Sequence, residues 1–98
     1  MADIDIDKIA EIHRQIDSVL LLDWDPIGVA NVPEAQDEYR SYCRGVYDVA
    51  VQTRSTHAVA QHLLRIEREC MELSFRSADD LLSVAQKILD LVSEVGPL

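Results

Sequence analysis

One group of side chains in this sequence places a carboxylate among hydrogen-bond donors. It comprises Trp24, Asp25, Tyr39, Tyr42 and Glu67. Glu67 falls within an otherwise apolar helical stripe, and burying a carboxylate without a partner is costly. Tyrosine hydroxyls and the tryptophan indole could supply the missing donors. We expect either a structural clasp, in which Asp25 pins a loop and Glu67 bonds to a tyrosine or an arginine, or a pocket that recognises a ligand or a partner residue.

Acidic pairs flank this group. Asp23 and Asp25 lie on either side of Trp24, and Asp37 and Glu38 lie near the expected start of the second helix. Their oxygens could hold a cation, but carboxylates at such positions are more often solvated or complement a helix dipole. We therefore keep Asp37 and Glu38 as binding candidates for a partner and expect no metal.

Patterns typical of catalysis are lacking. The sequence contains no glycine-rich phosphate loop, HExxH, GxSxG or calcium-binding loop. His57 and His62 are separated by about 140° around a helix, so they do not form a metal-binding pair on one face. We assign no catalytic residue and no cofactor, and the pattern favours a protein that is not an enzyme.

Apolar residues recur at the spacing of one helical face, about 100° per residue, in four segments. The stripes predict helices over residues 6–22, 34–53, 56–73 and 78–94. Pro26, Gly28 and Pro33 mark a loop between the first two. Residues 1–98 are therefore expected to form a single all-α domain, a small bundle of about four helices.

The formal charge of −9 is concentrated near the N-terminus. It divides into −8 over residues 1–39, +2 over 40–76 and −3 over 77–98. An acidic balance of this kind disfavours binding to nucleic acid or to an anionic membrane. The first residues lack the features of a secretory signal, so we expect a cytoplasmic protein with Cys43 and Cys70 as reduced, buried thiols.

The chain also carries motifs of a known kind. Asp23-Trp24-Asp25-Pro26-Ile27-Gly28-Val29 is followed by Asp37-Glu38-Tyr39, then by Tyr42, Leu64-Arg65-Ile66-Glu67 and Met71-Glu72-Leu73. Over about residues 9–92 the chain resembles a family of small uncharacterised bacterial helical proteins, a domain of unknown function marked by a WDPIG loop and a DEY helix start. The resemblance implies a compact all-α fold in the bacterial cytoplasm and no known reaction. Arg40 departs from the acidic residue that the family tends to have there.

Three functional hypotheses follow. We favour a non-catalytic protein-interaction module whose acidic loop meets a basic partner, in the manner of an immunity protein or antitoxin. The second is a small-molecule-binding or hydrolytic protein with a pocket formed by Trp24, Tyr39 and Glu67. The third is a homodimer that buries the wide apolar stripe of the helix expected over 78–94.

Overall fold

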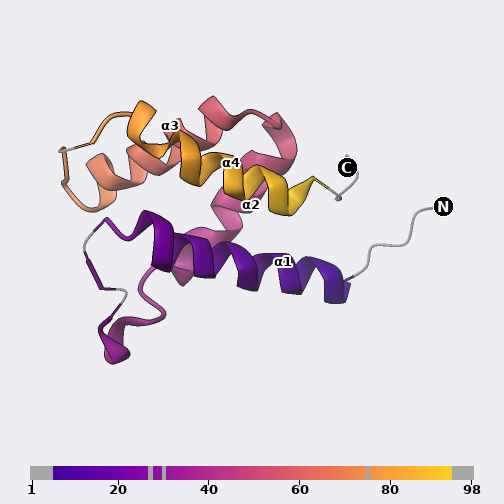
Figure 1. The fold of residues 1–98 in the computed structure, drawn as a ribbon, viewed down its shortest axis with the longest axis horizontal. Helices are drawn as coiled ribbons and strands as arrows, with labels where there is room; N and C mark the ends of the chain where they lie inside the picture. The colour runs from indigo at the N-terminus through magenta and orange to yellow at the C-terminus, as the bar shows by residue number, and fades with distance from the viewer. Residues whose placement is uncertain (1–5, 27, 30, 75, 94–98) are drawn as a thin grey trace.

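A computed structural model describes residues 6–26, 28–29, 31–74 and 76–93 of the chain. In this part of the chain there are four α-helices and no β-strand, which confirms the expected small all-α bundle (Figure 1). The helices are α1 (Ile6–Val19), α2 (Cys43–Thr53), α3 (Thr56–Arg65) and α4 (Leu82–Val92). Short helical turns flank them: η1 (Leu20–Trp24), η2 (Pro33–Ala35), η3 (Arg40–Tyr42), η4 (Ile66–Cys70) and η5 (Asp79–Leu81).

The four α-helices surround one apolar core. α1 and α4 run side by side in opposite directions, α3 lies along α4, and α2 crosses behind them (Figure 1). All four helices and the adjoining turns contribute side chains with no exposed surface, among them Ile16, Leu20, Val46, Ala50, Val59, Leu63, Leu81, Ala85, Ile88 and Val92. Burial of the apolar face of each helix therefore determines how the helices pack against one another.

The helix expected over 34–53 is an α-helix only from Cys43 onward. Residues 33–42 instead form successive tight turns whose bonds span three residues, such as Glu38 N to Ala35 O and Tyr42 N to Tyr39 O. Tyr39 is fully buried against the end of α1. We attribute the delayed helix start to this tertiary contact, which overrides the local preference of the segment.

Both α1 and α3 end in a π-helical turn. Helical structure at the end of α1 extends to Trp24 rather than residue 22, and that at the end of α3 stops at Cys70 rather than residue 73. A π-helical turn advances fewer degrees per residue than an α-helix, so the residues within it shift around the axis. Cys70 is consequently exposed, and the expectation that both cysteines are buried was wrong for this residue.

The apolar stripe of α4 is largely used within the bundle. Val84, Ala85, Ile88 and Val92 are buried, and the outward positions Ser83, Gln86, Lys87 and Asp90 are polar and exposed. The α-helix spans Leu82–Val92 after the turn η5, and residue 94, the expected end, lies outside the described residues. No helix in the described part of the chain has the length and apolarity needed to cross a membrane.

Candidate functional site

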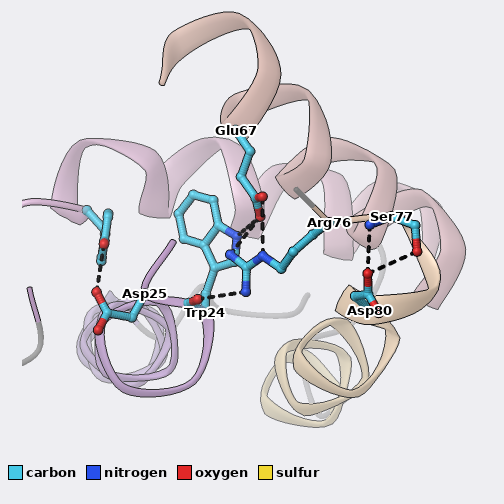
Figure 2. A network of polar contacts seen from close by, with 7 residues as sticks. Trp24, Asp25, Glu67, Arg76, Ser77 and Asp80 are labelled. Atoms are coloured by element: carbon cyan, nitrogen blue, oxygen red, sulfur yellow. Dashed lines mark hydrogen bonds and ion pairs between the residues drawn. The ribbon is translucent and has the colours of Figure 1, made fainter. Parts of the chain in front are cut away.

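The carboxylate of Glu67 is the centre of a buried polar cluster between the ends of α1 and α3 (Figure 2). Trp24, the last residue of η1, donates its indole N–H to Oε2 of Glu67 at 2.8 Å. Both side chains are only 1% exposed. The π-helical turns that follow α1 and α3 therefore meet at this hydrogen bond.

Arg76, in the segment between η4 and η5, completes the cluster. Its Nη2 donates to Oε2 of Glu67 at 2.8 Å and its Nε donates to Oε1 at 3.3 Å. Its Nη1 donates to the backbone carbonyl of Trp24 at 3.1 Å (Figure 2). The guanidinium thus supplies a countercharge for the buried carboxylate and ties a third segment of the chain to it.

The sequence pattern left the partner of Glu67 open between a tyrosine and an arginine. The structure supplies an arginine together with the Trp24 indole, and it gives the tyrosine hydroxyl of Tyr39 to Asp25 instead. Sequence reasoning did not single out Arg76. The only signal was that a carboxylate on an apolar stripe requires a cation from elsewhere in the chain.

Asp25 fixes the loop that follows η1. Its Oδ1 accepts hydrogen bonds from the backbone N–H of Val29 at 2.7 Å and from the hydroxyl of Tyr39 at 2.8 Å. The residue has a left-handed backbone with φ of +31°, which aspartate tolerates better than most residues. Pro26 disfavours a right-handed helical backbone at Asp25, so the helical structure ends there.

The aromatic candidates pack against one another beside this cluster. The ring of Trp24 lies 5.2 Å from that of Tyr39 and 6.1 Å from that of Tyr42, measured between centroids. The Tyr42 contact is edge-on, with an interplanar angle of 86°. Such geometries add about 1 kcal/mol per pair beyond burial, so the rings stabilise the start of the η3 and α2 region against α1.

Asp37 and Glu38 do not join the cluster. Both side chains are exposed, and neither carboxylate has a hydrogen bond or an ion pair with another described residue. The structure therefore divides the seven binding candidates into two sets. Trp24, Asp25, Tyr39, Tyr42 and Glu67 come together in or beside the core, whereas Asp37 and Glu38 face solvent.

Neither of two hollows on the described surface is lined by Trp24, Tyr39 or Glu67. One, of about 520 Å³, lies between α1 and the start of α2. The other, of about 220 Å³, lies along α3. Both oxygens of Glu67 are already occupied by donors, so this carboxylate is not placed to act as a general base.

Ligands for a metal ion do not assemble in the described part of the chain. No three histidine, cysteine, aspartate or glutamate side chains there lie close enough together to hold one. His57 is exposed, and His62 is half-buried with its ring packed over Gly45. These positions give the histidines of α3 a packing role or a solvent-facing one.

Comparison with known proteins adds no identification. The chain matches no protein-family model, no curated protein sequence and no solved structure. The resemblance to the WDPIG and DEY family stays a prediction, and Ile27 of that motif lies outside the described residues. Function is therefore inferred from the division between the buried cluster and the exposed carboxylates.

Proposed function

We propose that this protein is a non-catalytic interaction module that binds a basic surface of a partner protein through residues 31–38, hereafter the acidic segment. The observation that carries the proposal is the state of its three carboxylates. Glu34, Asp37 and Glu38 are all exposed and have no hydrogen bond or ion pair with another described residue. They are therefore available to cationic side chains of another molecule.

Several other exposed carboxylates are used internally. Glu11 pairs with Arg14, Asp23 pairs with Lys87 at 2.9 Å, and Glu69 lies 3.9 Å from Arg65. The negative charges of these three carboxylates are partly neutralised by the neighbouring cations. Asp7, Glu72 and Asp79 are exposed and unpaired with described residues too, but they are single positions in separate segments, whereas Glu34, Asp37 and Glu38 lie within five residues. This clustering supports the acidic segment as the place where a basic partner is recognised.

The acidic segment is held before any partner arrives. Backbone bonds link Val32 N to Val29 O at 2.9 Å and Ala35 N to Val32 O at 3.0 Å. Asp25 ties Val29, on one side of the segment, to Tyr39, on the other side. Prior ordering lowers the entropy lost on association, so such a segment suits recognition.

Apolar surface accompanies these charges. Val32 is 39% exposed within the acidic segment, and Leu22 in η1 is 68% exposed. Interfaces commonly combine an apolar centre with a polar, charged rim. Val32 supports the proposal because it would give the contact a desolvated centre among the carboxylates.

The overall charge supports the same class of function. A formal charge of −9 on 98 residues steers a cationic partner towards the protein and speeds encounter. Small acidic proteins of this kind suit the neutralisation of a basic toxin, so we propose an immunity-like or antitoxin-like role in the cytoplasm. Free thiols at Cys43 and Cys70 are consistent with that compartment.

The two alternatives rank below this proposal. A pocket formed by Trp24, Tyr39 and Glu67 has weak support because all three side chains are buried and line neither hollow. A homodimer through α4 has weak support because the exposed positions of that helix are polar.

Affinity capture from cell lysate tests the proposal with two matched variants. The first, E34Q/D37N/E38Q, neutralises the acidic segment. The second, D7N/E69Q/D79N, removes the same number of charges from exposed positions elsewhere. We expect a basic protein to be retained by the wild type and the second variant, to be lost by the first, and to be released as salt rises.

Either of two results would overturn the proposal. One is capture of the same partner by both variants with equal affinity. The other is the recovery of no specific partner by the wild type at low salt.

A further inference from the structure

The larger hollow, of about 520 Å³, lies between α1 and the start of α2 and is rich in arginine. Arg14 contributes from α1, Arg40 from η3 and Arg44 from the first turn of α2. Asp17 is the single carboxylate in the lining. A chain with twice as many acids as bases thus gathers three cations against one anion here.

The arginines are only partly neutralised. Arg14 pairs with Glu11 on the same face of α1. Arg40 has its Nε 3.6 Å from Oδ2 of Asp17, a long contact, and its side chain is 68% exposed. Arg44 is exposed and has no ion pair with a described residue. Planar guanidinium groups in this state are well suited to bind oxyanions through paired N–H donors.

A histidine lies beside the arginines. His13 also lines the hollow, and its Nε2 is buried without a hydrogen-bond partner among the described residues. Its ring packs against Tyr47 at 4.6 Å between centroids. The Nε2 atom is covered by the protein, so His13 contributes its ring to the wall of the hollow and the arginines supply the donors for a ligand.

Covalent chemistry at this site is disfavoured by the state of Cys43. The thiol lies in the lining, and its Sγ is 3.7 Å from Oδ1 of Asp17. Burial, followed by the negative charge of Asp17, raises the pKa of the Cys43 thiol to about 12. The thiol therefore stays protonated near neutral pH and is not a nucleophile. The site is suited to bind an anion rather than to attack it.

We propose that this hollow binds a phosphate dianion, either free phosphate or the monoester of a small molecule. A dianion can engage two arginine forks at once and can compete with Asp17, whereas a single carboxylate has only the charge that Asp17 already supplies. The volume falls within the range of small-ligand sites and leaves room for an organic group. This inference does not rest on the proposed protein-interaction function.

Nuclear magnetic resonance titration of the full chain with phenyl phosphate tests the site. At low ionic strength we expect saturable shifts at His13, Arg40 and Arg44, with a Kd of about 1 mM or tighter. Inorganic phosphate is titrated in parallel. Equal affinity for the two identifies free phosphate as sufficient, and tighter binding of phenyl phosphate identifies a monoester. Benzoate serves as the carboxylate of matching shape and is expected to bind at least about tenfold more weakly.

Two variants locate the effect. Arg44→Gln is expected to weaken phenyl phosphate binding by about tenfold or more, whereas Arg65→Gln, an exposed arginine on α3, is expected to leave it within about twofold. The proposal is overturned if no saturable shifts appear, if benzoate binds as tightly as phenyl phosphate, or if both variants weaken binding equally. The wild-type shift map decides the location even if Arg44→Gln folds poorly.

Discussion

The indole N–H of Trp24 and the carboxylate of Glu67, 43 positions apart in the chain, share a 2.8 Å hydrogen bond inside the core. The accepting oxygen, Oε2, also receives Nη2 of Arg76 at 2.8 Å. One oxygen therefore joins the end of α1, the end of α3 and the segment before α4. Removing the carboxylate charge of Glu67 leaves Arg76 without its counterion, whereas removing the indole N–H leaves the ion pair in place.

This arrangement predicts an order of destabilisation. Glu67→Gln should lower the free energy of unfolding by about 3 kcal/mol, because the half-buried Arg76 loses its countercharge. Trp24→Phe should lower it by about 1 to 2 kcal/mol through the lost hydrogen bond and packing. Urea unfolding measures both. Glu69→Gln, an exposed change in the same turn, should stay within about 0.5 kcal/mol of wild type. Equal stability of Glu67→Gln and Glu69→Gln would contradict the clasp.

The bond between Tyr39 and Asp25 predicts energetic coupling. Tyr39→Phe removes the hydroxyl that donates to Oδ1 of Asp25 and should cost about 1 kcal/mol of unfolding free energy. The same change should cost much less in an Asp25→Ala background, because the acceptor is then gone. A double-mutant cycle by urea unfolding measures the coupling, and additive effects of the two changes would show that the bond contributes nothing.

Arg54 joins two helix ends from a strained backbone. It has φ of +51°, and its side chain donates to the carbonyls of Val51 at 3.1 Å and Val92 at 2.7 Å. Arg54→Ala loses the donors but keeps the strain, whereas Arg54→Gly loses the donors and relieves the strain. The Gly variant should therefore be more stable than the Ala variant by about 1 kcal/mol, measured by thermal unfolding. A less stable Gly variant would argue against the left-handed conformation.

His62 predicts a pH dependence of stability. Burial, followed by the positive charge of Arg65, lowers the pKa of its imidazole from the ordinary value of 6.5. The unfolded chain then binds a proton more readily than the folded chain, so stability is present above pH 6.5 and is lost as pH falls towards the folded-state pKa. His62→Gln should lose less stability than wild type between about pH 7.5 and about pH 5.5. Parallel profiles for the two proteins would rule out this contribution.

The helical stripes could be recognised from the sequence because they depend on local spacing. Four helices follow from apolar residues that recur at about 100°, and the structure contains them. The start of α2 could not be recognised in this way. Tyr39 adopts φ of −99° and ψ of 1° at the edge of η3, and its burial beside Trp24 depends on a contact between distant segments.

The polar cluster around Glu67 could also be recognised only in part from the sequence. Glu67 was recognisable as a carboxylate that needs a partner, because an isolated buried charge is unfavourable. Arg76 was not, since it lies in an irregular segment with no periodic pattern and reaches Glu67 only through the packing of η4. Asp37 and Glu38 were expected to be solvated or to complement a helix dipole. They are solvated, but the helix expected from residue 34 is replaced there by turns, which the local pattern did not indicate.

We propose that the buried candidates hold the fold while the exposed carboxylates of the acidic segment are available for recognition. Urea unfolding of E34Q/D37N/E38Q beside Glu67→Gln tests this division of roles. Three neutralised carboxylates reduce the formal charge from −9 to −6 and should leave the unfolding free energy within about 0.5 kcal/mol of wild type or raise it, since self-repulsion falls. Glu67→Gln should lose about 3 kcal/mol. A loss in the triple variant as large as that of Glu67→Gln would contradict the account, because the carboxylates of the acidic segment would then be part of the fold.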